Sequence, residues 1–247
     1  MVESSMGDNQ NTVEGRIVIP GDVVVLKTNE DDGKKIRLGP GLRQESEEVI
    51  VCKCGIIRHK TDPETYWVDC HQKRYVPTKG EFVIGIVLQK AGDTFVVDIG
   101  GSVPASLSYL AFEGATKRNR PNVQIGDIVY GRLLVANKDM EPEMVCIDGG
   151  GKGDGLGVIN RNRGGYMFKC SLGLVRKILS KECNLIKGLG QHIKFEVMAG
   201  MNGRIWVNAA KPEETIVLMN AISMSEYMTE EQIKIMVQKL INALSTF

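Results

Sequence analysis

The chain has 247 residues, of which 43% are hydrophobic and 25% charged, and its formal net charge is +1. These values are ordinary for a globular protein and allow one or two ordinary domains or three small ones. No apolar run approaches the roughly 20 residues that a membrane span needs.

The polar, acidic start of the chain lacks the basic and apolar parts of a secretory signal, and we expect residues 1–15 to form a disordered tail. In such a chain, cysteines are expected to be reduced thiols in an intracellular protein rather than a disulfide framework. The six cysteines are Cys52, Cys54, Cys70, Cys146, Cys170 and Cys183.

Residues 16–78 are predicted to form a small all-β domain. Short strand-like stretches lie at 16–26, where Pro20 and Gly21 interrupt the strand, and at 49–52 and 66–70. Polar loops and turn residues separate them, and no helical period is present. Such spacing is typical of a β domain.

Residues 79–148 are predicted to form a closed barrel of five short strands. An interior glycine, Gly85, indicates a bend or bulge in the first strand, and glycines also follow the second strand. Small barrels depend on such glycines for their curvature. The strands are expected at 82–88, 94–99, 107–110, 128–136 and 144–148.

Residues 149–164 are predicted to be a linker. Their glycine-rich start lacks the Gly-Lys-Ser/Thr ending of a phosphate-binding loop and the glycine spacing of a dinucleotide-binding fold. A flexible or turning connection is the simpler interpretation.

Residues 165–247 are predicted to form an α+β domain followed by an extra helix. Asn-Gly between two strand-like stretches is a strong hairpin signal, and Ser171, Pro212 and the pair Thr229 and Gln232 are helix-start signals. The expected order is a strand at 166–170, a helix after Ser171, strands at 193–199 and 204–209, a helix from Pro212 and a helix after Thr229.

Positive charge is concentrated in residues 150–211, which carry eleven lysines and arginines and three acids, whereas the stretch from Pro212 onward carries a net charge of −3. Such a segment favours a polyanion or an acidic protein as partner, although a solvated basic face is also possible.

No catalytic constellation is recognisable in the sequence. Asp93, Asp98 and Asp127 stand singly at turns and strand ends, where aspartate is common, and metal-dependent RNA hydrolysis needs several carboxylates together. A zinc site would have to use Cys52, Cys54, His59, Cys70 and His71. Because the Cys-x-Cys gap is too short and Cys70 adjoins His71, we expect no metal and no cofactor.

RNA binding has more support from the residue types. OB-type barrels bind single strands by stacking bases on aromatic rings beside a positive groove. The candidate contacts are Lys90, Phe95, Lys117, Arg118 and Arg120. Two alternatives stay open: Phe95 could pack in the core, and the basic loop 117–120 could dock on a protein.

Several of these motifs coincide with one known family. The segment 79–148 resembles the S1-type OB fold in 85–87, in 97–100 and in Gly126-Asp127. The wider chain, from about Ile19 onward, resembles the eukaryotic RNA exosome cap subunits of the ribosomal-RNA-processing protein 40 type, also called exosome component 3. The segments that carry this resemblance are 39–42, 72–77, 104–107, 115–123, 136–144 and 200–207.

The resemblance implies a fold and a role. The fold would be mainly β with a C-terminal α+β part: a small N-terminal β domain, an S1-type OB barrel and a KH-like domain. The protein would be a non-catalytic cap subunit that stabilises a ring of RNase PH-like subunits, beside other cap subunits. It would guide single-stranded RNA into the channel for 3′-to-5′ degradation by associated nucleases, in the nucleus, nucleolus and cytoplasm.

The KH-like domain departs from the usual pattern. KH domains hold RNA with a Gly-x-x-Gly loop between two helices, but here the motif that starts at Gly200 lies between two strands. We therefore expect Gly200, Asn202, Gly203 and Trp206 to form a structural hairpin, and the resemblance likewise links this signature to domain packing. The alternative functions are a free-standing OB-fold RNA-binding or translation factor and an exoribonuclease.

Overall fold

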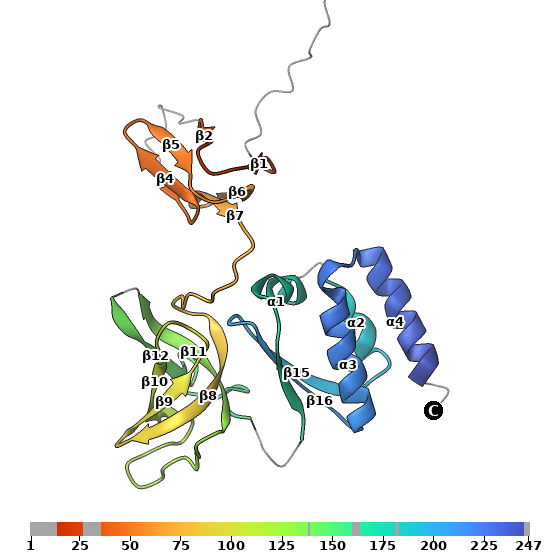
Figure 1. The fold of residues 1–247 in the computed structure, drawn as a ribbon. Helices are drawn as coiled ribbons and strands as arrows, with labels where there is room; N and C mark the ends of the chain where they lie inside the picture. The colour runs from red at the N-terminus through yellow and green to blue at the C-terminus, as the bar shows by residue number, and fades with distance from the viewer. Residues whose placement is uncertain (1–13, 27–35, 138, 160–163, 181–182, 245–247) are drawn as a thin grey trace, which may run out of the picture. The chain divides into compact units, whose positions relative to one another are not determined.

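The computed structural model describes residues 14–26, 36–137, 139–159, 164–180 and 183–244. Residues 1–13 of the expected tail lie outside this part of the chain. The chain divides into two compact units, 1–71 and 72–247, and Figure 1 shows the elements of each.

The N-terminal unit consists of short strands in two small sheets, as predicted for a β domain. One sheet has the order β1-β6-β7-β3 and the other β2-β5-β4. The strands are β1 (Ile17–Val18), β2 (Val23–Val24), β3 (Arg37–Leu38), β4 (Leu42–Glu45), β5 (Glu48–Val51), β6 (Gly55–Thr61) and β7 (Glu64–Asp69).

The core of this unit is small, and the strands contribute to it residues that alternate with outward-facing ones. In β6, Ile57 is fully buried while its neighbours face outward, and Val18, Val51 and Val68 join it in one apolar cluster. Strand β6 was not predicted from the sequence. It contains one fully buried residue among mostly polar ones, so its period-2 pattern is weak.

The middle of the chain is the predicted closed barrel. Strand β12 pairs with both β10 and β11, which closes the order β12-β10-β9-β8-β11 into a cylinder. The strands are β8 (Phe82–Ala91), β9 (Thr94–Asp98), β10 (Ala105–Phe112), β11 (Ile128–Asn137) and β12 (Met140–Cys146).

Gly85 was expected to mark a bend or bulge in β8, but the structure shows that it allows two strands to approach closely. The register of β8 against β9 shifts between Val87 and Gln89, two residues later. At Gly85 itself a Cβ atom would overlap the side chain of Val97 on β9. Glycine is therefore required there for the close approach of two strands.

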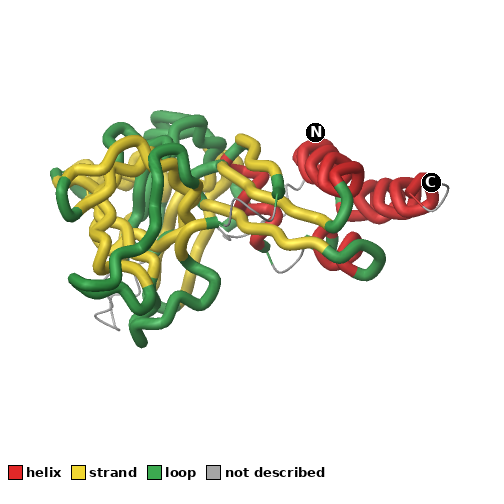
Figure 2. Tube along the Cα trace, turned by 90° about the horizontal axis from the view of Figure 1, so that it is seen from below, coloured by secondary structure: helices red, strands yellow, loops and turns green. Residues whose placement is uncertain are grey.

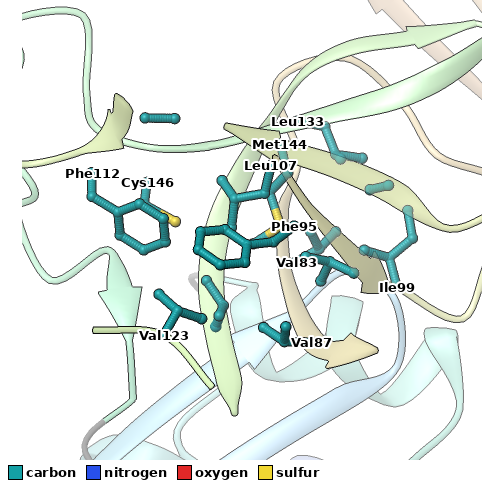
Figure 3. Packing of buried hydrophobic residues seen from close by; sticks show 14 of the residues in the cluster. Val83, Val87, Phe95, Ile99, Leu107, Phe112, Val123, Leu133, Met144 and Cys146 are labelled. Carbon is teal, nitrogen blue, oxygen red and sulfur yellow. The ribbon is translucent and has the colours of Figure 1, made fainter. Parts of the chain in front are cut away.

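The barrel interior is filled by aliphatic and aromatic side chains that alternate along the strands. Figure 3 shows Val83, Leu107, Leu133 and Met144 converging from four strands, and each is at most 1% exposed. This interior is a packed core rather than a pore.

The described residues of the connection 149–164 include a turn and a strand that pairs with the barrel. Asp148 donates its N–H to the carbonyl of Lys152 at 2.8 Å, which makes the glycine-rich stretch a tight turn. Strand β13 (Gly157–Val158) then pairs antiparallel with β11.

The described residues of the C-terminal part form an antiparallel sheet, in the order β14-β16-β15, and four α-helices. The described α-helices all follow β14 in the chain, and Figure 2 colours the helices red. The elements are β14 (Tyr166–Lys169), α1 (Leu172–Leu179), α2 (Leu185–Gly190), β15 (Phe195–Gly200), β16 (Arg204–Ala209), α3 (Pro212–Met224), a 3₁₀ turn (Ser225–Tyr227) and α4 (Glu230–Leu244).

The helix starts follow the sequence signals. The Ser171 hydroxyl accepts the Leu174 N–H at 3.0 Å, and Thr229 and Gln232 bond reciprocally at the start of α4. Helix α2 was not predicted. It has six residues, two of them glycines, and no side-chain cap, so its helical signal is weak.

Candidate nucleic-acid interface

The basic loop between β10 and β11 has a defined shape. The Asn119 N–H donates to the Thr116 hydroxyl at 3.0 Å, the Thr116 N–H donates to the Asn119 carbonyl at 2.9 Å, and the Asn119 amide reaches Gly114 O at 3.2 Å. Lys117 and Arg118 stand exposed at this turn. Their backbone is therefore held while their charged ends stay free to meet a polyanion.

Arg120 holds the loop against the turn between β8 and β9. Its guanidinium lies 3.2 Å from the Asp93 carboxylate and 4.8 Å from the centre of the Tyr109 ring. An ion pair and a cation–π contact thus share one side chain. The same β-turn follows Lys90, which is exposed on β8. Lys90 and the basic loop accordingly belong to neighbouring connections of the barrel.

Phe95 is not a surface platform. It is 8% exposed, belongs to the barrel core and packs edge-on against Phe112 with 6.3 Å between ring centres. Figure 3 shows the Phe95 ring among the core side chains. Alternation along β9 turns it inward with Val97. The prediction of Phe95 as an RNA contact is therefore corrected to core packing.

Residues 201–203 form the turn of the hairpin between β15 and β16, and Gly200 is the last residue of β15, paired with Arg204. Gly203 adopts φ +76°, and a Cβ there would lie 2.7 Å from the Cys170 carbonyl. A left-handed conformation beside a close carbonyl requires glycine.

Asn202 inserts from this turn into the barrel. Its amide nitrogen donates to the carbonyls of Ile84 and Ile99, both at 2.8 Å, and its amide oxygen accepts the Ile84 N–H at 3.3 Å. Met201 adds a backbone bond to the Phe82 carbonyl at 2.9 Å. Asn202 is only 8% exposed. Its hydrogen bonds to Ile84 and Ile99 join the KH-like domain to the barrel.

Arg204, the first residue of β16, makes a second connection and was not singled out from the sequence. Its guanidinium donates to the Asp98 carbonyl at 2.6 Å, the Ile84 carbonyl at 3.3 Å and the Asp98 carboxylate at 2.6 Å. Partial burial opposes ionisation of Asp98, but the Gly100 N–H and the Arg204 guanidinium outweigh it and lower the carboxyl pKa. No local pattern marks a buried arginine whose partners lie more than 100 residues away.

Trp206 completes the junction. It is 3% exposed and packs in a cluster with Ile84 and Ile159, which come from the barrel strand β8 and from the connection after β13. Gly165, at φ +93°, lies against the indole ring, because a Cβ there would come within 2.6 Å of it. The ring is therefore almost completely buried and not available for stacking on a base.

The loop that would carry a KH clamp has no glycine. Helices α1 and α2 are joined by residues 180–184, whose sequence is Ser-Lys-Glu-Cys-Asn; Lys181 and Glu182 lie outside the described residues. Backbone clamping of RNA by that loop therefore has no sequence basis.

The candidate zinc ligands do not come together in the structure. Among the residues described, no three His, Cys, Asp or Glu side chains gather as a metal site. His59 stacks on Tyr66 with 4.3 Å between ring centres, and Cys52 and Cys54 are exposed free thiols. Within that same part of the chain, no helix has the length and apolar character to cross a membrane.

Comparison with known families identifies all three regions. The family described as "Mammalian exosome complex component RRP40, N-terminal" matches residues 16–71, "Exosome complex component RRP40, S1 domain" matches 75–157, and "KH domain" matches 165–213. Exosome complex component RRP40 of Mus musculus is 51% identical, over 90% of this chain and 89% of its own length.

The chain belongs to the RRP40 family. Exosome complex component RRP40 of Drosophila melanogaster is 45% identical over 85% of this chain and 89% of its own, and that of Saccharomyces cerevisiae is 33% identical over 83% and 86%. A solved structure described as "Crystal structure of putative exosome complex RNA-binding protein" has the same fold, with a TM-score of 0.58 and 22% identity over 70% of this chain and 98% of that one. The predicted family and fold class are thus confirmed.

Proposed function

We propose that this RRP40-family chain is a non-catalytic, RNA-binding cap subunit of the RNA exosome. The observation that carries the proposal is the match of its N-terminal, S1 and KH regions, in order, to RRP40. The fold supports it, because Asn202 and Arg204 connect the barrel to the KH-like domain. A subunit that has to hold RNA at a channel entrance benefits from such a fixed scaffold.

A non-catalytic role fits the engagement of the carboxylates. Asp93 pairs with Arg120, Asp98 pairs with Arg204, and the Asp127 carboxylate accepts the Gln124 N–H at 2.6 Å. Each carboxylate thus has a structural partner in the fold. Degradation of RNA from the 3′ end would then be done by associated nucleases.

The proposed RNA contacts are Lys90, Lys117, Arg118 and Arg120, of which Arg120 also pairs with Asp93. Lysine and arginine contacts to phosphate give affinity without reading sequence. Binding of single-stranded RNA by the isolated chain is expected to be weak, salt-sensitive and tolerant of sequence.

The proposed partners are RNase PH-like ring subunits and the other cap subunits, in the nucleus, nucleolus and cytoplasm. The test is affinity purification of the tagged chain from its own cells, with the stoichiometry of the recovered proteins measured. One copy per complex with RNase PH-like subunits and a nuclease is expected. Recovery alone or with ribosomes only would reject the exosome role and favour a free-standing RNA-binding factor.

A further inference from the structure

A groove of about 400 Å³ lies between α2 and α4 of the KH-like domain. It shares no residue with the basic barrel loop or with the hairpin at the junction, and the RNA-binding role does not use it. Helices α2 and α4 pack against each other directly, so both walls are regular structure.

The floor of the groove is apolar and continuous. Ile233, Val237 and Ile241 stand four residues apart and therefore follow one face of α4. Gly188 of α2 lies opposite, where an added Cβ would be 3.5 Å from Val237. A Cβ there would make ordinary van der Waals contact with Val237, so Gly188 lies close to this floor without a side chain to cover it.

The rim is basic and polar. Exposed Lys187 and His192 stand on the α2 side and exposed Lys234 on α4, and the remaining polar lining residues carry amides. None of the described residues that line the groove is acidic. The aliphatic floor consists of buried Ile233 and Val237 and half-buried Ile241. Such a floor within a basic rim is complementary to a ligand that combines aliphatic and carboxylate groups.

We propose that this groove binds a short acidic segment of a partner protein that carries aliphatic anchor side chains. Three floor residues at helical spacing span roughly 12 Å, which suits two anchors of an amphipathic helix. RNA is less suitable, because among the described lining residues there is no Phe, Tyr or Trp to stack on a base.

The test uses the full chain and a fluorescent peptide that has two leucines four residues apart, flanked by glutamates. Binding is measured by anisotropy and mapped by backbone amide shifts of Gly188 and Val237. We expect saturable binding that Lys234→Glu weakens about tenfold or more. The matched control is Lys239→Glu, because Lys239 is exposed on the same helix outside the groove, and it should leave affinity within about twofold.

A second variant, Gly188→Leu, should fill the groove and abolish binding, while circular dichroism confirms that α2 and α4 remain folded. The proposal is overturned if no binding occurs at about 1 mM peptide, or if a peptide with lysines in place of the glutamates binds equally well. A uridine-rich RNA that shifts the same two amides and displaces the peptide would identify a nucleic-acid site instead.

Discussion

At the scale of single residues, Asn202 is a neutral amide that satisfies three backbone groups of another domain. Its partners are the N–H and carbonyl of Ile84 and the carbonyl of Ile99. Buried groups left without partners are costly. We expect Asn202→Ala to lower the free energy of unfolding by about 1–3 kcal/mol in urea titration. Asn220→Ala, at an exposed site on α3, is the control. Equal urea midpoints for the two variants would contradict a stabilising role of the Asn202 amide.

The ion pair of Asp98 with Arg204 should make the stability of the fold depend on pH at acidic values. Arg204 and the Gly100 N–H hold its pKa below the ordinary value of 3.8. Its stabilising contribution is therefore complete above that value and is lost as the pH falls through the lower, folded-state pKa. Asp98→Asn should flatten the fall in stability below about pH 4, as measured by thermal unfolding across pH. A variant curve parallel to the wild type would show that this pair does not contribute.

The role of the exposed cations of the barrel in RNA binding can be tested by measuring how affinity depends on salt concentration. Lys117→Ala combined with Arg118→Ala should weaken binding of uridine-rich and adenine-rich single strands alike. The slope of log affinity against log salt should fall by about 1.4, since each lost phosphate contact removes roughly 0.7. Lys239→Ala, on α4, should leave the slope unchanged. Loss of affinity for one sequence only would indicate base reading rather than phosphate contact.

Phe95 and Asn202 show what residue types can and cannot reveal. Alternation correctly indicates a strand at 94–99, but an aromatic side chain on a barrel strand is equally compatible with either face. The Asn-Gly pair predicts a hairpin through local backbone preference. The sequence does not say that the amide of Asn202 binds Ile84, 118 residues away, because that contact depends on how two domains pack.

At the scale of elements, Lys177 ties α1 to the end of α3. Its ammonium donates to the carbonyls of Ser225 and Met228, both at 2.6 Å, and more weakly to that of Glu226. A cation there complements the carbonyls at the C-terminal end of the helix, although the Ser225 carbonyl also accepts the Met228 N–H at 3.3 Å. Lys177→Met should lower stability by about 1–3 kcal/mol and speed hydrogen exchange at 225–230. Lys194→Met, at an exposed position, should change neither quantity.

Helices with strong start signals in the sequence were predictable, and the helix without such a signal was not. Helices α1, α3 and α4 start at Ser171, Pro212 and Thr229 because capping and proline act within one turn. Helix α2 contains two glycines and depends on packing of Leu185 and Leu189, both fully buried. Tertiary burial, rather than propensity, makes this segment helical.

At the scale of the whole molecule, the barrel and the KH-like domain share one compact unit, 72–247. We expect a protein of these residues to unfold in one calorimetric transition, because Asn202, Arg204 and Trp206 join the two cores. Replacing Asn202 and Arg204 together by alanine should separate the transition into two. Two transitions in the unaltered 72–247 protein would show that the junction does not couple the domains.

The junction also limits how domains can be exchanged between relatives to make chimaeras. Asn202 binds only main-chain groups of the barrel, so it can meet any barrel that presents the same backbone at 84 and 99. Arg204 also binds the carboxylate of Asp98, a side chain that a foreign barrel can lack. A transplanted KH-like domain should therefore be accepted only with its matching aspartate, and restoring that one residue should rescue a failed transplant.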